Sequence, residues 1–441
     1  LALGLPDLSN DSGAYLKYAR TRIDSGIHGH EIQNGPDMHR ELGYPFFIAS
    51  VLRPFEWIVG REDVFALKWI TFCQGLFFLT ALACLVFLPG SSQRYRRVFA
   101  AVLFLSPTLW GAHTVIYSES LAATLVIFAF VAAFRSVETQ SLGACLAFGL
   151  LIGLQGLVRY SQVYWVFFCG FVGGFASIYF RVRGQSALAS KLFLSGILAI
   201  LCVASWNLRN RLVLGPEAYS IREPIVLAGK ILRVESIDLF NHLPQALVCA
   251  VGTNLCQRIY GEAASFPFEI RESDRLGIKA WKDHVESYTG SATARFRDFR
   301  KQYFRRYLDH PFLQFVGSLV EMVRIGFCES VPPFGTRGLS FTFFPRIWHF
   351  AGSLLVWALF WSGLSTLSRA ERSVRLVMVL SLAWITYHFA LMSQVTNLVR
   401  YVIPLLPCIY AVGALFVLRL ANTATDRWSK SSRSVSQVAR Q

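Results

Sequence analysis

The chain has 441 residues, of which 54% are hydrophobic and only 16% charged, and its mean hydropathy is +0.43. These values exclude an ordinary soluble globular protein and are typical of a polytopic membrane protein. We attribute the formal net charge of +16 to basic loops beside anionic lipid, so we expect a lipid bilayer and no nucleic acid among the partners.

Residues 1–65 precede any long apolar stretch, and we expect them to form a first outer loop. Within it, "NDSGAYLKYAR" at residues 10–20 predicts a helix in which Asp11 acts either as a cap or as a chemically active acid. Tyr15 follows at helical spacing. Because the first residue is leucine rather than methionine, we expect a further membrane helix before this loop.

Crossing ~30 Å of hydrocarbon takes about 20 residues of helix, and nine apolar stretches reach or approach this length. Six form a block at 66–207 and three form a second block at 347–420, followed by a basic cytoplasmic tail at 421–441. The sequence therefore predicts an all-α polytopic membrane protein. The nine stretches are residues 66–88, 98–115, 118–134, 142–158, 163–180, 191–207, 347–366, 374–393 and 401–420.

Basic residues cluster in the loops after the first, fifth and seventh stretches and in the C-terminal tail. When nine spans alternate, these segments all fall on one side, which the positive-inside rule makes the cytoplasm. Residues 1–65 and the long segment 208–346 then lie outside. The basic residues concerned are Arg94, Arg96, Arg97, Arg181, Arg183, Lys191, Arg369, Arg372, Arg375, Arg427, Lys430, Arg433 and Arg440.

The long outer segment, 208–346, has two features of its own. Residues 311–328 are apolar but short and carry two charges, so we expect an interfacial helix at the outer membrane face. A tenth span there would put the basic loops on the wrong sides. Cys249 and Cys256 lie in the same segment, where an oxidising compartment permits a disulfide, and the paired and free states both stay open.

Acids and arginines recur at the expected outer ends of spans that are not adjacent in sequence. Each alone is a common interfacial anchor. As a group they would enclose a polar cavity, in which an acid abstracts a proton and cations hold a phosphate. The candidates are Asp11, Arg40, Tyr44, Glu119, Arg159, Arg209, Arg211, Arg400 and Tyr401.

These residues resemble the GT-C superfamily of membrane glycosyltransferases, especially the branch of bacterial lipid A aminoarabinose transferases and protein O-mannosyltransferases. The resemblance covers most of the chain and rests on the order and spacing of "DSGAYLKYA", "GYPFFIA", "YSESLAATL", "GLLIGLQGLVRY", "WNLRNRLVLG" and "RYVIPLLP". It implies a GT-C-like helical bundle whose outward-facing loops contain short helices. It also implies inverting transfer of a sugar from a polyprenyl-phosphate-linked donor to a glycan, lipid or protein acceptor, outside the bacterial cytoplasmic (inner) membrane.

The resemblance also assigns roles to individual residues. It places the catalytic acid of the first outer loop on Asp11 and a second acid on Glu119. Many members carry an adjacent acidic pair in the first loop, where this chain has Asn10, Asp11 and Ser12, so we assign no metal ligands and leave a divalent metal cofactor open. The implied donor-phosphate residues are Arg159, Arg209, Arg211, Arg400 and Tyr401, and the acceptor-side residues are Arg40, Tyr15 and Tyr44.

Two other functions stay open. A flippase or transporter of lipid-linked glycans would also place charges in a membrane cavity, although transporters commonly show repeated halves and broken helices near the midplane. A polymerase or ligase that moves a whole lipid-linked glycan would use the same chemistry as the transferase. A metal site at His28, His30 and Glu31 lacks complete zinc-like spacing. We find no phosphate-binding glycine loop and no nucleophile elbow.

Overall fold

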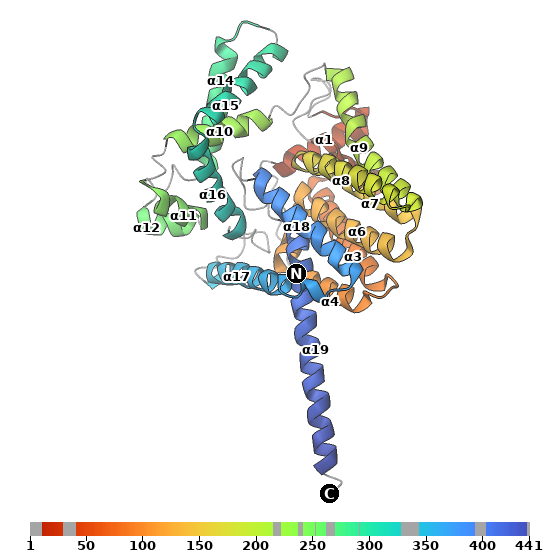
Figure 1. Ribbon diagram of the computed structural model, residues 1–441. Coiled ribbons are helices and arrows are strands. Elements are labelled where there is room, and N and C mark those ends of the chain that lie inside the picture. The colour runs from red at the N-terminus through yellow and green to blue at the C-terminus, as the bar shows by residue number, and fades with distance from the viewer. Residues whose placement is uncertain are drawn as a thin grey trace.

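The computed structural model describes residues 11–29, 41–214, 222–236, 241–251, 253–261, 270–290, 292–327, 344–392 and 403–438. Within these ranges the chain is helical and contains no strand (Figure 1). Six of the described helices are long and apolar enough to cross a membrane. The expected class, an all-α polytopic membrane protein, is therefore confirmed.

The N-terminal region, which was expected as a first outer loop, folds into two helices that pack on the start of the bundle. They are α1 (Asp11–Ser25) and α2 (Gly43–Val59), and α3 (Asp63–Phe87) follows directly. Tyr15, Ile48 and Ile70 share one buried apolar cluster, which joins the three helices. At Gly43 an added Cβ would lie 2.7 Å from the backbone nitrogen of Val158. Only glycine therefore allows the start of α2 to approach the end of α7 so closely.

The next stretch, expected as one span over 98–115, is two helices in the structure. They are α4 (Gln93–Phe104) and α5 (Pro107–His113). Pro107 has no backbone N–H to donate and disfavours helical geometry at the preceding residue. Ser106 is accordingly extended, and its side chain caps α5 by accepting a hydrogen bond from the backbone N–H of Leu109. The stretch is therefore divided between α4 and α5, although its hydropathy gives no sign of a break.

Four helices complete the first block. They are α6 (Ser118–Thr139), α7 (Leu142–Val158), α8 (Val163–Val182) and α9 (Ser186–Leu214). Glycines let α9 approach its neighbours, because a Cβ on Gly149 or Gly153 of α7 would meet α9 at under 3 Å. At the end opposite α1, the fully buried Arg96 pairs with Glu138 at 2.9 Å. This arginine, expected in an inner loop beside lipid, is instead neutralised inside the protein.

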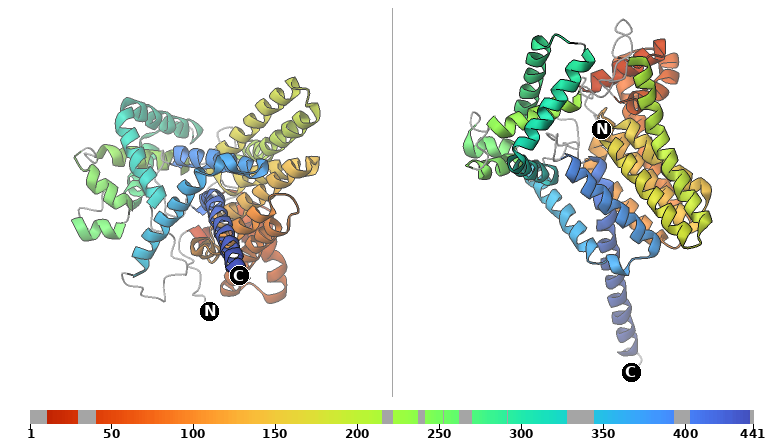
Figure 2. Two further views of the ribbon diagram at one scale, coloured as in Figure 1. Left: turned by 60° about the horizontal axis from the view of Figure 1, so that its bottom comes forward. Right: turned by 45° about the horizontal axis from the view of Figure 1, so that its top comes forward.

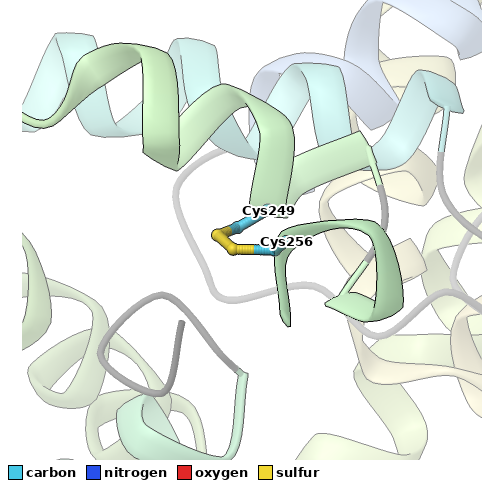
Figure 3. The surroundings of a disulfide bond; sticks show 2 residues. All are labelled: Cys249 and Cys256. Carbon is cyan, nitrogen blue, oxygen red and sulfur yellow. A yellow bond between two sulfur atoms is a disulfide. The ribbon is translucent and has the colours of Figure 1, made fainter. Parts of the chain in front are cut away.

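The described helices of the long segment that was expected outside, which we call the outer segment, form a separate group beside the bundle (Figure 1). A disulfide joins Cys249 to Cys256, with Cα atoms 4.7 Å apart, and links two successive short helices (Figure 3). The pairing that the sequence left open is therefore present. The helices are α10 (Arg222–Ser236), α11 (Leu243–Val251), α12 (Thr253–Tyr260), α14 (Ile270–Ser287), α15 (Ala292–Asp309) and α16 (Pro311–Phe327).

The C-terminal block consists of α17 (Phe344–Leu364), α18 (Arg372–Met392) and α19 (Leu406–Val438). The first part of α19 is buried in the main core, and the rest projects well beyond the other helices (Figures 1 and 2). Of the nine expected spans, six correspond to the long apolar helices α3, α6, α8, α9, α18 and α19. The other three correspond to α4–α5, to the 17-residue α7 and to α17, whose apolar part among the described side chains is Leu354–Leu364.

Candidate functional site

Helix α1 lies across the turn that precedes α6. Ser12 donates a hydrogen bond to the carbonyl of Ile116 at 3.2 Å, and the Tyr15 hydroxyl donates one to Ser118 Oγ at 3.3 Å. Asp11 is the first residue of α1, so these two bonds fix the start of the helix that carries the expected catalytic acid. The side chain of Asp11 lies outside the described atoms. Its position in the helical register is on the face that holds Tyr15.

Tyr44, expected on the acceptor side with Tyr15, belongs to the packing beneath α1. Its ring contacts that of Tyr15 edge-on at 4.8 Å, and its hydroxyl donates to Gln74. Gln74 in turn donates to the carbonyl of Val115 at 3.0 Å. Burial raises the pKa of Tyr44 well above its ordinary value, and the nearby Tyr15 and Glu119 act in the same direction. Both tyrosines are buried, and they hold α1 and α2 on the bundle.

Glu119 and Arg159 form a buried ion pair between α6 and α7. The Glu119 Oε1 and Arg159 Nη1 atoms are 3.0 Å apart, and the two side chains are only 4% and 7% exposed. Glu119 lies in the first turn of α6 and Arg159 caps the end of α7. Helix dipoles favour an acid at a helix start and a base at a helix end. Two helices joined by a short turn therefore bring these charges together at one end of the bundle.

Two buried glutamines flank Arg159 in the sequence. Gln155 lies one helical turn earlier on the same face of α7, and Gln162 donates its backbone N–H to the Arg159 carbonyl at 2.9 Å. Both side chains are fully buried, and within the described part of the chain neither amide has a hydrogen-bond partner. Buried polar groups are normally paired, so these amides mark a place where a ligand or water would be stabilised.

Arg209 lies over an aromatic ring at the same end of the bundle. Its guanidinium carbon is 4.9 Å from the Trp206 ring centre, a cation–π geometry. Trp206 also contacts the buried His28 edge-on at 5.3 Å. His28 follows α1, so this contact joins the end of α9 to the first outer loop, and Figure 2 shows α1 beside that end of α9.

A second arginine, Arg22, lies close enough to Arg209 for the two like charges to repel. Arg22 is on α1, its guanidinium lies over the Phe46 ring at 4.9 Å, and partial burial lowers its pKa. An anion between the two guanidiniums would offset both the repulsion and the desolvation. Arg22 was not among the residues expected in the site, although the spacing of Asp11, Tyr15 and Arg22 is helical and places all three on one face.

Of the remaining candidates, the structure describes only Arg211. Arg211 lies two residues after Arg209 on α9, and residues two apart do not share a helix face. Arg211 therefore lies on another side of α9, where it is exposed. Arg40, Arg400 and Tyr401 lie outside the described residues. In the described ranges no three His, Cys, Asp or Glu side chains come together as metal ligands. The question of a divalent metal thus stays where the sequence left it.

Comparisons with protein-family models, with curated proteins and with solved structures found no match for this chain. The fold and composition nevertheless define its class, which is that of an all-α protein with several helices able to cross a membrane. At one end of this bundle the structure brings together a buried ion pair, two neighbouring arginines and the start of α1.

Proposed function

We propose that the protein is an inverting glycosyltransferase of the GT-C type. It moves a sugar from a polyprenyl-phosphate-linked donor to a glycan, lipid or protein acceptor at the outer face of the bacterial cytoplasmic membrane. The observation that carries the proposal is the position of α1. Its end is joined to α9 by the contact of His28 with Trp206, which places Arg22 near Arg209, and its start places Asp11 beside the turn that leads to Glu119. This arrangement joins a cationic site to a carboxylate at one end of an apolar bundle.

Arg22 and Arg209 are suited to the donor phosphate. When the glycosidic bond breaks, the lipid phosphate leaves as an anion and needs positive charge more than it needs a proton. Guanidinium groups donate two parallel hydrogen bonds to phosphate oxygens, which fixes the leaving group as well as stabilising it. The Trp206 ring packs against the Arg209 guanidinium and so restricts its position. The unpaired amides of Gln155 and Gln162 provide further hydrogen-bonding groups for hydroxyls of the sugar.

Asp11 is assigned as the general base. The acceptor hydroxyl oxygen forms the new bond to the anomeric carbon as the bond from that carbon to the phosphate oxygen breaks. The acceptor proton goes to the Asp11 carboxylate, and the bonding electron pair leaves with the phosphate. Because the acceptor attacks opposite the leaving group and no enzyme-linked intermediate forms, the configuration at the anomeric carbon inverts.

Glu119 is assigned a positioning role rather than that of a base. Its two carboxylate oxygens are already engaged, one by the Arg159 guanidinium and the other by the Ser118 hydroxyl. The pair instead keeps Arg159 at the end of α7, next to Gln155 and Gln162, and holds Ser118 where Tyr15 contacts it.

The test is a transfer assay with the purified protein in lipid nanodiscs. Envelope lipids and glycans from cells with and without the gene are compared first, and the decoration that is lost identifies donor sugar and acceptor. Arg22→Gln is expected to reduce use of the lipid-phosphate donor at least tenfold. Lys17→Gln, a matched loss of charge at an exposed position of the same helix, is expected to leave it unchanged. An unaltered envelope combined with full donor use by Arg22→Gln would contradict the proposal.

A further inference from the structure

Helix α16 of the outer segment buries polar side chains and exposes large apolar ones. Its buried positions include Gln314, Ser318 and Glu321, which are 0%, 2% and 0% exposed. These polar residues recur at spacings of four and three and so lie on one face of the helix. Val316 and Val320 are buried beside them in an apolar cluster. The buried face of α16 therefore combines polar and apolar side chains, whereas a helix on the surface of a soluble domain usually buries only its apolar face.

The buried polar face is held by α10. Lys230 donates a hydrogen bond to Ser318 Oγ at 2.8 Å, and Arg233 forms an ion pair with Glu321. Lys230 and Arg233 are themselves buried. Rotating α16 to bury its other face would leave these charges without partners at high cost. The polar contacts with α10 therefore fix the orientation of the helix together with the buried Val316 and Val320.

The outward face of α16 is a stripe of large apolar side chains. Phe312, Phe315 and Leu319 are 66%, 55% and 42% exposed, and their spacing of three and four residues places them on one face. The stripe continues the end of α15, where Phe304 and Leu308 are 57% and 56% exposed. Exposed apolar surface of this extent marks a site of protein or membrane contact.

Basic residues accompany the apolar stripe on α15. Arg297, Lys301 and Arg305 are all exposed and recur every four residues, so they follow the same side of the helix as Phe304 and Leu308. Large apolar side chains flanked by lysine and arginine are typical of helices that lie in the boundary between lipid headgroups and acyl chains. The charge of the flanking residues selects anionic headgroups.

The position of α16 fits a bilayer surface. The helix contacts both α17 and α18, and α18 is one of the helices long and apolar enough to cross a membrane. In Figure 1, α16 runs from the end of α15 down to these two helices, while α14 and α15 extend away from the bundle. With 17 residues, α16 is shorter than most spanning helices.

We propose that α16 and the end of α15 form a membrane-docking edge, in which the apolar stripe from Phe304 to Leu319 enters the outer leaflet and the basic residues of α15 bind anionic phospholipid headgroups. The edge holds the outer segment against the bilayer. It fits an anionic bilayer better than a second protein, because cationic and apolar side chains lie on one helix that already contacts the spanning helices.

The test measures the depth of single fluorescent labels in nanodiscs. Phe315→Cys and Leu319→Cys carry the label in a background that lacks other free cysteines and keeps the Cys249–Cys256 bond. Thr289→Cys, at the exposed turn before α15, is the control. Phosphatidylglycerol discs should protect labels 315 and 319 at least fivefold from aqueous iodide relative to label 289. A nitroxide near the headgroup should quench them more than one at the acyl-chain end.

Equal iodide quenching at positions 315 and 289 would overturn the proposal, because the stripe would then face water or a partner absent from the discs. Strongest quenching by the deep nitroxide would also overturn it and make α16 a span. Lys301→Gln/Arg305→Gln should reduce the difference in label 315 protection between phosphatidylglycerol and phosphatidylcholine at least twofold. Lys279→Gln/Lys282→Gln, which removes two exposed charges from α14, should not. An unchanged difference in the α15 variant would refute the role of anionic lipid.

Discussion

The carboxylate of Glu119 and the guanidinium of Arg159 lie 3.0 Å apart inside the protein, where both side chains are almost fully shielded from solvent. They join the start of α6 to the end of α7. An ion pair in this position costs desolvation that only the partner charge and further hydrogen bonds offset. The pair is therefore a structural element whose two halves depend on each other.

Removing one half of this pair should be more harmful than removing both. Glu119→Gln or Arg159→Gln leaves an uncompensated buried charge and is expected to destabilise the protein by about 3–5 kcal/mol. Glu119→Gln/Arg159→Gln should recover much of this loss. Thermal unfolding in detergent, followed by size-exclusion chromatography, measures the effect. Additive losses in the double variant would show that the two charges do not interact.

Asp11 is the second test. Asparagine caps a helix about as well as aspartate, so Asp11→Asn should preserve expression, thermal stability and donor binding. If the carboxylate takes the proton of the acceptor, turnover should fall by roughly 10²–10⁴-fold. The measurement is initial transfer rate in nanodiscs with saturating donor. Turnover near that of the unmodified protein would reduce Asp11 to a cap.

The two arginines at the end of α9 should separate in their effects. Arg209→Ala removes a charge-assisted contact to the donor phosphate and is expected to cost about 2–4 kcal/mol of transition-state stabilisation. Arg209→Lys should retain part of the activity, since the charge stays but the bidentate geometry is lost. Arg211→Ala should cost far less, because Arg211 is exposed on another side of α9. Comparable losses in kcat/KM at both positions would place the phosphate elsewhere.

Lys230 predicts a pH dependence of the outer segment. Burial lowers the pKa of Lys230 from 10.5 to about 7, while Glu321 acts to raise it and Arg233 to lower it. Between about pH 7 and pH 10.5, Lys230 is protonated in the unfolded chain but not in the folded one. Stability should therefore rise with pH across this window, by at most about 1.4 kcal/mol per unit. Below the folded-state pKa of Lys230 the residue is protonated in both states, so its contribution to the free energy of unfolding stays constant at its lowest value.

Hydrogen exchange of the α10 and α16 amides at pH 7 and pH 9, corrected for intrinsic rates, measures this slope. Lys230→Met should flatten it, whereas Lys279→Met, at an exposed position of α14, should keep it. A slope that survives in Lys230→Met would assign the effect to another group.

Thiol labelling in intact cells tests the orientation. Ser91→Cys lies at an exposed position of a short loop expected inside, and Ser186→Cys lies at the exposed first residue of α9, on the same expected side. Thr289→Cys lies in the outer segment. In a background without other free cysteines, an impermeant maleimide should modify position 289 and spare positions 91 and 186 until the membrane is permeabilised. The reverse pattern would invert the topology and remove the site from the outer face.

Hydropathy alone predicts the long helices, since α3, α6, α8, α9, α18 and α19 are apolar over most of their length. It does not register the break at Pro107, because a window average is insensitive to one missing backbone N–H. The alternation of spans placed Glu119 and Arg159 at the same end, but their contact depends on how α6 and α7 pack. The helical spacing from Asp11 to Arg22 could have identified Arg22 as a residue on the same face. The position of Arg22 near Arg209, in contrast, depends on α1 lying beside the end of α9.

The face that α16 buries could not be predicted for a different reason. Its composition shows an amphipathic helix, and an interfacial helix was expected there, but periodicity does not say which face the protein buries. The partners of the buried face include Lys230 and Arg233, which are distant in sequence from Ser318 and Glu321. The state of the Gln155 and Gln162 side chains could not be predicted either. Among the described residues their amides have no hydrogen-bond partner, and this depends on how the helices pack.

The bond between Cys249 and Cys256 also sets an order of events during biogenesis. Thiols are kept reduced in the cytosol and form lasting disulfides in oxidising compartments outside it. If α11 and α12 lie outside the membrane, as proposed, their link is completed only after this part of the chain has been translocated. The supply of oxidising equivalents, and not only insertion into the bilayer, would then govern when a newly made chain becomes mature.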